Sequence, residues 1–477
     1  MPLCQRNSEG FVFATRLFNL SLITLPFVML AMLIALLDFV GRGFIDILPR
    51  PILPVATARL DNGLQIIAIP DHRAGVVTHM VVYRVGSADE KAGKSGIAHF
   101  FEHLMFRGTP RYPDGAFAEH VAALGGQSNA FTSYDYTAYF ERVSSDRLAD
   151  MMEMEADRMQ NLIINPDIVR IERDVILEER SLRTDGNPAA LLSEKTRARL
   201  HKSRPYAVPV IGHRAEIAAL NAQDATAFYK NYYAPDNAIL VVAGDVTLAE
   251  LMPLAQKTYG VLQPQNRPRN PRPQTTNLLV EDWQKPEIRR DARVRQAQWT
   301  RYYRLPIFTR AQRKKFAAFE VGMEILGGGT TSRLYQALVI NKELAVSAGA
   351  FADTVRLNNG EAVIYVTAND GKDFSALAAA VDAQIKQLIA RPVPPDTLKR
   401  AKTQLAAELI FARDSQYTMA QIFGLNAALG FAPQDVLDWP QLIEAVTAQE
   451  VQTALADWLQ PQHSIVSHLL PAAKRGK

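Results

Sequence analysis

The hydrophobic positions after residue 55 first follow the pattern of β-strands. Residues 64–69 and 76–83 are runs of β-branched and other apolar side chains, and the turn-forming sequence Asp61-Asn-Gly63 precedes the first run. Another strand-like run covers residues 237–245, and a further strand group is expected within residues 129–143. Helical patterns lie between these runs, so the chain is expected to combine strands with several helices.

The longest apolar run lies near the N-terminus, at residues 17–37, and contains no charged residue. About twenty apolar residues are enough to cross a bilayer as a helix. We therefore predict a short N-terminal segment at residues 1–16 and a hydrophobic helix at 17–40, which is either an uncleaved signal anchor or a cleaved signal peptide. In a bacterium, this predicts an inner-membrane anchor with periplasmic catalytic domains, or a periplasmic protein after cleavage.

A stretch rich in proline, arginine and asparagine divides the rest of the chain. Residues 264–273 cannot form a core and are typical of a solvated interdomain linker. The predicted segments are a tether at residues 41–55, a first domain at 56–262, a linker at 263–290 and a second domain at 291–477.

The sequence His99-Phe-Phe-Glu102-His103 places three chemically active side chains within five positions. Residues three and four apart share one face of a helix, so both imidazoles can point at one cation with the Glu102 carboxylate beside them. Two neutral imidazoles suit Zn²⁺, and a nearby carboxylate can take a proton from water that the metal activates. The order of residues is HxxEH, the inverse of the commoner HExxH.

A catalytic zinc site usually has three protein ligands, so a carboxylate from another element is expected. The best segment is residues 171–180, where Ile171, Val175 and Ile176 fit a helix that buries one apolar stripe. Glu172 and Glu179 lie seven residues apart and share a face, whereas Glu178 points elsewhere and is expected to be solvated. Spacing alone does not choose among these acids.

Composition narrows the class of protein only slightly. The 477 residues are 48% hydrophobic and 21% charged, which is typical of a globular chain with two or more domains. The net charge of +4 is too small to indicate nucleic-acid binding. The single cysteine, Cys4, excludes an intrachain disulfide and a cysteine-based metal site.

The run from Gly96 to Thr109 resembles the active-site signature of the pitrilysin–insulinase family of inverted-zincin peptidases, in the branch of the mitochondrial processing peptidase and its bacterial relatives. Further matches extend the likeness over roughly residues 55–470, including the segments 125–132, 172–180, 228–235, 237–245 and 327–338.

The resemblance implies two related α+β domains, each with a sheet flanked by helices, which form a clam-like half-chamber with zinc only in the first. It implies that Glu179 is the third zinc ligand and that Glu172 supports the ligands from outside the metal shell. It also implies that Asn129, Ala130 and Thr132 lie on an edge strand that binds an extended peptide.

The second domain departs from the family pattern. Active relatives carry an arginine there and a tyrosine seven residues later, which are thought to stabilise the oxyanion. By the resemblance, these positions are Val339 and Val346, which cannot donate a side-chain hydrogen bond. We therefore expect a homologous partner subunit that supplies the missing arginine and tyrosine.

The expected function is that of a zinc endopeptidase with one Zn²⁺ per chain and Glu102 as the base, acting on extended or unfolded peptides within a heterodimer. Two alternatives remain open. One is a non-catalytic assembly or scaffold subunit, which the valines favour. The other is a membrane-anchored peptide-binding chaperone.

Overall fold

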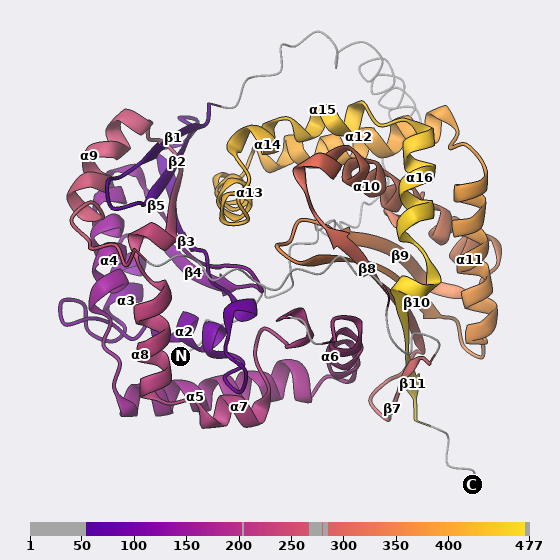
Figure 1. Ribbon diagram of the computed structural model, residues 1–477, viewed down its shortest axis with the longest axis horizontal. Helices are drawn as coiled ribbons and strands as arrows, with labels where there is room; N and C mark the ends of the chain where they lie inside the picture. Colours follow the sequence, from indigo (N-terminus) through magenta and orange to yellow (C-terminus); the bar gives the residue numbers. More distant parts are fainter. Residues whose placement is uncertain (1–53, 203–204, 267–278, 280–284, 473–477) are drawn as a thin grey trace, which may run out of the picture.

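The computed structural model describes residues 54–202, 205–266, 279 and 285–472, and these are built around two β-sheets (Figure 1). The first sheet has the order β1-β2-β6-β3-β5-β4. Its strands are β1 Ala56–Arg59, β2 Gln65–Pro70, β3 Val76–Tyr83, β4 Gln127–Thr132, β5 Thr137–Ser144 and β6 Ala238–Gly244. All neighbours are antiparallel except β2 and β6, and β4 forms one edge. The predicted strand regions are confirmed.

The helices of the first half carry the HxxEH motif and the acidic segment on separate elements. They are α2 Ile97–Leu104, α3 Ala116–Ala123, α4 Leu148–Asn161, α5 Pro166–Arg180, α6 Pro188–Leu200, α7 Arg214–Ala219, α8 Ala222–Tyr232 and α9 Leu248–Thr258. A π-helical turn, Ser181–Asp185, continues directly from α5. Helix α2 packs against α5, α8 and β4, so the motif lies between the acidic helix and the sheet edge.

The second sheet has the order β7-β11-β8-β10-β9. Its strands are β7 Glu287–Asp291, β8 Gln298–Ile307, β9 Ala345–Asp353, β10 Asn359–Ala368 and β11 Ser464–Pro471. Only β7 and β11 are parallel. The second sheet is thus largely antiparallel, like the first.

The second half has its own set of helices around this sheet. They are α10 Arg313–Gly327, α11 Phe374–Ala390, α12 Pro395–Ala412, α13 Gln416–Ala428, α14 Pro433–Leu437, α15 Trp439–Glu444 and α16 Ala448–Trp458, with a π-helical turn at Tyr335–Asn341. Helix α10 packs on α12, α16 and β9, as α2 packs on α5, α8 and β4. The predicted α+β class, with two related halves, is therefore confirmed.

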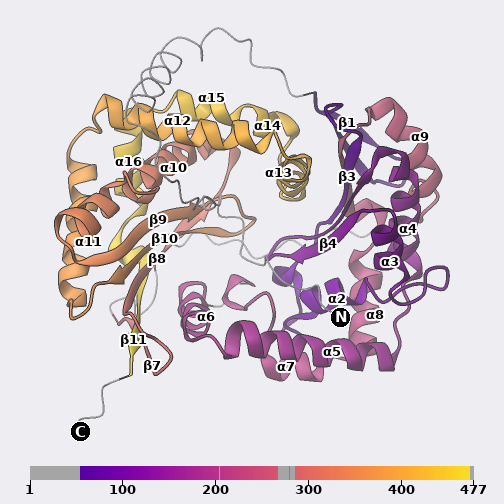
Figure 2. The same cartoon turned by 180° about the vertical axis from the view of Figure 1, so that it is seen from behind.

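Each half packs one helix against the sheet of the other half. Helix α13 of the second half lies against β3 and β6 of the first sheet, next to β3 in both views (Figures 1 and 2). Met419 and Phe423 of this helix are buried in one core with Met80 and Val241. In the other direction, α6 of the first half lies against the second sheet and buries Leu200 there. The domain limits that we predicted from the sequence remain a prediction.

The expectation of an inner-membrane anchor needs correction. Among the described residues, no helix has both the length and the apolar character needed to span a bilayer. The segment on which the expectation rested, residues 17–40, lies outside the described part of the chain, as do the segment 1–16 and most of the tether. The structure therefore lends no support to the N-terminal hydrophobic helix, the membrane contact or the inner-membrane location.

Candidate metal centre

Helix α2 starts at a position that only glycine suits. Gly96 has φ of 86°, and a Cβ there would lie 2.5 Å from the backbone oxygen of Ile211. The Glu90 carboxylate accepts hydrogen bonds from the amides of Gly96 and Ala98, both at 3.0 Å. These contacts satisfy the first turn of α2 and hold the helix in place.

The structure brings His99, His103 and Glu179 together. The Nε2 atoms of His99 and His103 lie 3.7 and 3.3 Å from Glu179 Oε2. One ligand atom from each residue falls within 4.8 Å of the others, and the described residues contain no second such group of three. The acid that spacing alone did not select is thus the one that meets both imidazoles.

Glu172 faces the opposite nitrogen of His103. Its Oε2 lies 3.1 Å from His103 Nδ1, and the Arg107 guanidinium pairs with its other oxygen. In a neutral imidazole that donates from Nδ1, Nε2 is the unprotonated nitrogen that can ligate a metal. Glu172 therefore orients the ring without meeting the three converging atoms.

The protonation states of these residues fit a zinc site. Burial lowers the pKa of His99 to about 3, helped by the neighbouring His103, so its imidazole is neutral at physiological pH. Burial would raise the pKa of Glu179, but the hydrogen bond with His103 and the charges around it lower that pKa to about 2. Two neutral imidazoles and an ionised carboxylate are donors that Zn²⁺ prefers. His99 Nδ1 is buried and has no hydrogen-bond partner among the described residues.

Glu102 belongs to α2, and its carboxylate contacts the last residue of β4. The Thr132 hydroxyl donates to its Oε2 at 2.6 Å. Burial is the main cause of the raised pKa of Glu102, with nearby His103 and the Thr132 hydrogen bond acting in the opposite direction. Thr132, which we expected on a peptide-binding edge, thus contacts the candidate base directly.

The other two predicted edge residues lie on β4, whose partner within the described sheet is β5. Asn129 is exposed, and its side chain accepts a hydrogen bond from the Ala130 amide at 2.8 Å. Ala130 is half-buried against the core of the first half. An exposed strand edge can pair with another extended chain, and peptide binding by these residues stays a prediction.

Sequence reasoning missed Arg183, whose Nη1 lies 2.6 Å from Glu179 Oε1. Arg183 belongs to the π-helical turn after α5, where Arg180 and Arg214 both pair with Asp185, at 3.3 and 3.2 Å. The spacing of four residues from Glu179 was the available signal. The two oxygens of Glu179 therefore have different neighbours, Arg183 on one side and the histidines on the other.

The two valines of the second half lie where a side-chain donor was expected. Val339 is partly buried in the π-helical turn Tyr335–Asn341, and Val346 is 43% exposed on β9. Neither side chain can donate a hydrogen bond.

Comparison with known proteins identifies similar chains over most of this length. A family model described as "Insulinase (Peptidase family M16)" matches residues 65–212, and one described as "Peptidase M16 inactive domain" matches residues 219–405. The zinc protease PqqE of Helicobacter pylori is 30% identical over 367 residues, which are 76% of this chain and 81% of that protein. The β subunit of the mitochondrial processing peptidase of Blastocladiella emersonii is 26% identical over 409 residues, covering 84% of this chain and 85% of that subunit.

Solved structures show the same architecture. A protease from Helicobacter pylori superposes with a TM-score of 0.80 at 27% identity, covering 88% of this chain and 99% of that one. The first half of the periplasmic protease PqqL from Escherichia coli has a TM-score of 0.72 at 20% identity, covering 87% of this chain and 92% of that one. The second likeness supports the fold alone.

Proposed function

We propose that this chain, which belongs to the insulinase (M16) family of peptidases, is a zinc-dependent endopeptidase acting on extended or unfolded peptides. The observation that carries the proposal is the convergence of His99, His103 and Glu179, with Glu102 on the same short helix as the histidines. Relatives named as zinc proteases and as a mitochondrial processing peptidase subunit support the same class of reaction.

In this proposal His99, His103 and Glu179 hold one Zn²⁺ per chain, and Glu172 orients His103 through Nδ1. Zinc, when bound, supplies the Lewis acidity that activates water at neutral pH. Glu102 takes the proton of the attacking water at Oε1 and passes it to the leaving amine. Thr132 holds the other oxygen of Glu102 in place.

The peptide is proposed to bind along β4 as an added strand, next to Asn129 and Ala130. This placement brings an extended backbone to the strand whose last residue, Thr132, contacts Glu102. Folded substrates would not present the required extended segment.

Replacing the base tests the function. Glu102→Gln should retain one zinc per chain and lose peptidase activity by at least about 100-fold, because the amide cannot accept the proton. Zinc is measured by mass spectrometry of the metal, and activity by cleavage of an unfolded fluorogenic peptide. Glu178→Gln, an exposed neighbour on α5, is the matched control and should behave as wild type. Retained hydrolysis by Glu102→Gln would remove Glu102 as the base.

We also propose that this chain is the zinc-bearing subunit of a heterodimer. The support is chemical: Val339 and Val346 leave the second half without the donors expected for the oxyanion. The partner would have the same fold, lack HxxEH and carry the arginine and tyrosine. In the same assay, adding such a partner should raise the rate; full activity of the purified chain alone, unchanged by a partner, contradicts the heterodimer.

The valines also favour one other candidate, a scaffold subunit without catalysis. That candidate predicts no chelator-sensitive peptidase activity with or without a partner. The intact set of His99, His103 and Glu179 favours the peptidase.

A further inference from the structure

The turn at residues 133–136, between β4 and β5, directly follows Thr132, the residue that contacts the candidate base. Thr132 ends β4 immediately before this turn and donates to Glu102 at 2.6 Å. Within the turn, the Ser133 amide donates to Tyr136 O at 2.8 Å. Where the turn sits therefore decides where the Thr132 hydroxyl, and with it the Glu102 carboxylate, can be.

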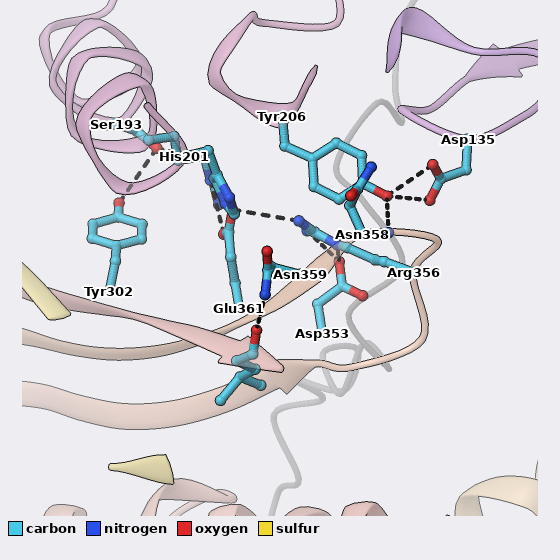
Figure 3. Close-up of polar contacts among 12 residues, drawn as sticks. Asp135, Ser193, His201, Tyr206, Tyr302, Asp353, Arg356, Asn358, Asn359 and Glu361 are labelled. Atoms are coloured by element: carbon cyan, nitrogen blue, oxygen red, sulfur yellow. Dashed lines mark hydrogen bonds and ion pairs between the residues drawn. The ribbon is translucent and has the colours of Figure 1, made fainter. Parts of the chain in front are cut away.

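Contacts from both halves hold this turn. Within the first half, the amides of Ser87 and Ala88 donate to Ser133 O and Tyr134 O at 3.0 and 2.9 Å. The other contacts run through Tyr206, just after α6, to residues of the second half. The Tyr206 hydroxyl lies 2.8 and 2.7 Å from the two oxygens of Asp135, to which it donates. It also accepts from the Asn358 amide at 3.0 Å, while the Leu357 amide donates to Asp135 Oδ2 at 3.2 Å. Asp135, Tyr206 and Asn358 are 2%, 1% and 1% exposed, so these contacts are shielded from water (Figure 3).

In the second half, the turn at residues 354–358 joins β9 to β10, and charged residues on both strands make further contacts there. Arg356 donates through Nε to Asp353 at 2.8 Å, and its guanidinium lies over the rings of Tyr134 and Tyr206. On β10, Glu361 pairs with His201 at 2.8 Å and accepts from Arg197 at 3.0 Å, which ties the end of α6 to the second sheet.

We propose that Asp135, Tyr206 and the turn at residues 354–358 form a latch through which the zinc-free half positions Glu102. Tyr206 is the positioning residue at its centre, since its hydroxyl bonds to both halves. A buried hydrogen bond is costly to break without a replacement partner, so the bonds of Asp135 and the Tyr206 hydroxyl favour one position of the turn. The catalytic part of this inference rests on the proposed role of Glu102, whereas the structural part does not.

Through the latch, the second half would contribute to positioning the candidate base in the first half. The second half has no histidine on α10 and no donor at Val339 or Val346, yet its turn contacts the element next to Glu102. Changes in how the halves meet would thus reach the base through Asp135 and Thr132 without contact with substrate.

The test compares two buried tyrosines in the full chain. Tyr206→Phe removes only the hydroxyl of the latch, whereas Tyr303→Phe removes a hydroxyl bonded to Arg301 within the second half. Hydrogen–deuterium exchange of peptides covering residues 127–136 should be about tenfold faster in Tyr206→Phe and unchanged in Tyr303→Phe. With one zinc still bound per chain, kcat of Tyr206→Phe should fall about tenfold.

Asp135→Asn is the second variant, used if Tyr206→Phe does not fold. Unchanged exchange at residues 127–136 in a folded latch variant would overturn the proposal. A uniform rise of exchange over both halves would also overturn it, because the hydroxyl would then only stabilise the whole chain. If the wild type has no zinc-dependent activity, the proposed function fails, but the exchange experiment still decides whether the latch exists.

Discussion

At the scale of single residues, two of the candidate ligands, His103 and Glu179, turn their two polar atoms towards different neighbours. His103 turns Nδ1 to Glu172 and Nε2 to Glu179, and Glu179 turns Oε1 to Arg183 and Oε2 to the histidines. These contacts fix the orientation of the His103 ring and the rotation of the Glu179 carboxylate. Less conformational freedom then has to be lost when a metal binds.

The contact between Glu172 and His103 predicts an effect on metal affinity. Glu172→Gln should weaken zinc binding about 10- to 100-fold, because the amide is a weaker acceptor for Nδ1 and the site loses a negative charge. Competition with a chromophoric chelator measures the affinity. Glu153→Gln, at an exposed pair with Arg111 on the same half, should leave it unchanged. Equal affinities for Glu172→Gln and wild type would contradict the orienting role.

At the scale of elements, α5 shows how a local pattern can mislead. The predicted stripe of Ile171, Val175 and Ile176 was wrong in part, since Ile171 and Val175 are 45% and 43% exposed. The helix instead buries Val169, Glu172, Ile176 and Arg180. Packing against α2 turns the acidic face inward, because Glu172 and Glu179 have partners there, and this rotates the apolar pair towards solvent.

Helix α10 repeats the packing of the zinc helix without its histidines. Its Glu320 accepts a hydrogen bond from Thr354, just after β9, at 3.0 Å, much as Glu102 accepts from Thr132 at the end of β4. Burial raises the pKa of Glu320 to about 7, with the Thr354 hydrogen bond acting in the opposite direction. The second half thus keeps a threonine–glutamate pair where the first has its candidate base.

This raised pKa predicts how stability depends on pH. The folded state holds the Glu320 proton more tightly than the unfolded state, so the contribution to stability is full below pH 4.5 and is lost as pH rises through about 7. Glu320→Gln should therefore exceed wild type in unfolding free energy by about 3 kcal/mol at pH 8 and match it near pH 4. Urea unfolding at both pH values measures this, with exposed Glu444→Gln as control. A gain that does not depend on pH would contradict the assignment to ionisation.

At the scale of the whole molecule, neither sheet is covered by its own half alone. The strands β3 and β6 have apolar side chains on both faces, and α13 of the second half covers one of them. Because α6 covers part of the second sheet in return, the halves are expected to unfold together.

Because α13 packs on the sheet of the first half, substitutions of its buried residues are expected to destabilise the fold. Phe423→Ala should lower the free energy of unfolding by about 3 to 5 kcal/mol, because it opens a cavity between α13 and the first sheet. Chemical denaturation followed by circular dichroism measures the loss. Phe411→Ala, at a phenylalanine that is 72% exposed, is the control and should change little. A small loss in Phe423→Ala would show that α13 contributes little to the first core.

The sequence by itself determined those features that depend on neighbouring residues. The HxxEH spacing places His99, Glu102 and His103 on one turn-and-a-half of helix, and the strand runs follow from local apolar patterns. The family resemblance implied Glu179 as the third ligand, and the tertiary structure brings this acid beside both imidazoles. Only the tertiary structure decided which face of α5 is buried and that Thr132 contacts Glu102. It also brought Asp135 and Tyr206 to the turn at residues 354–358. These outcomes depend on contacts between residues far apart in the chain, and local periodicity carries no information about them.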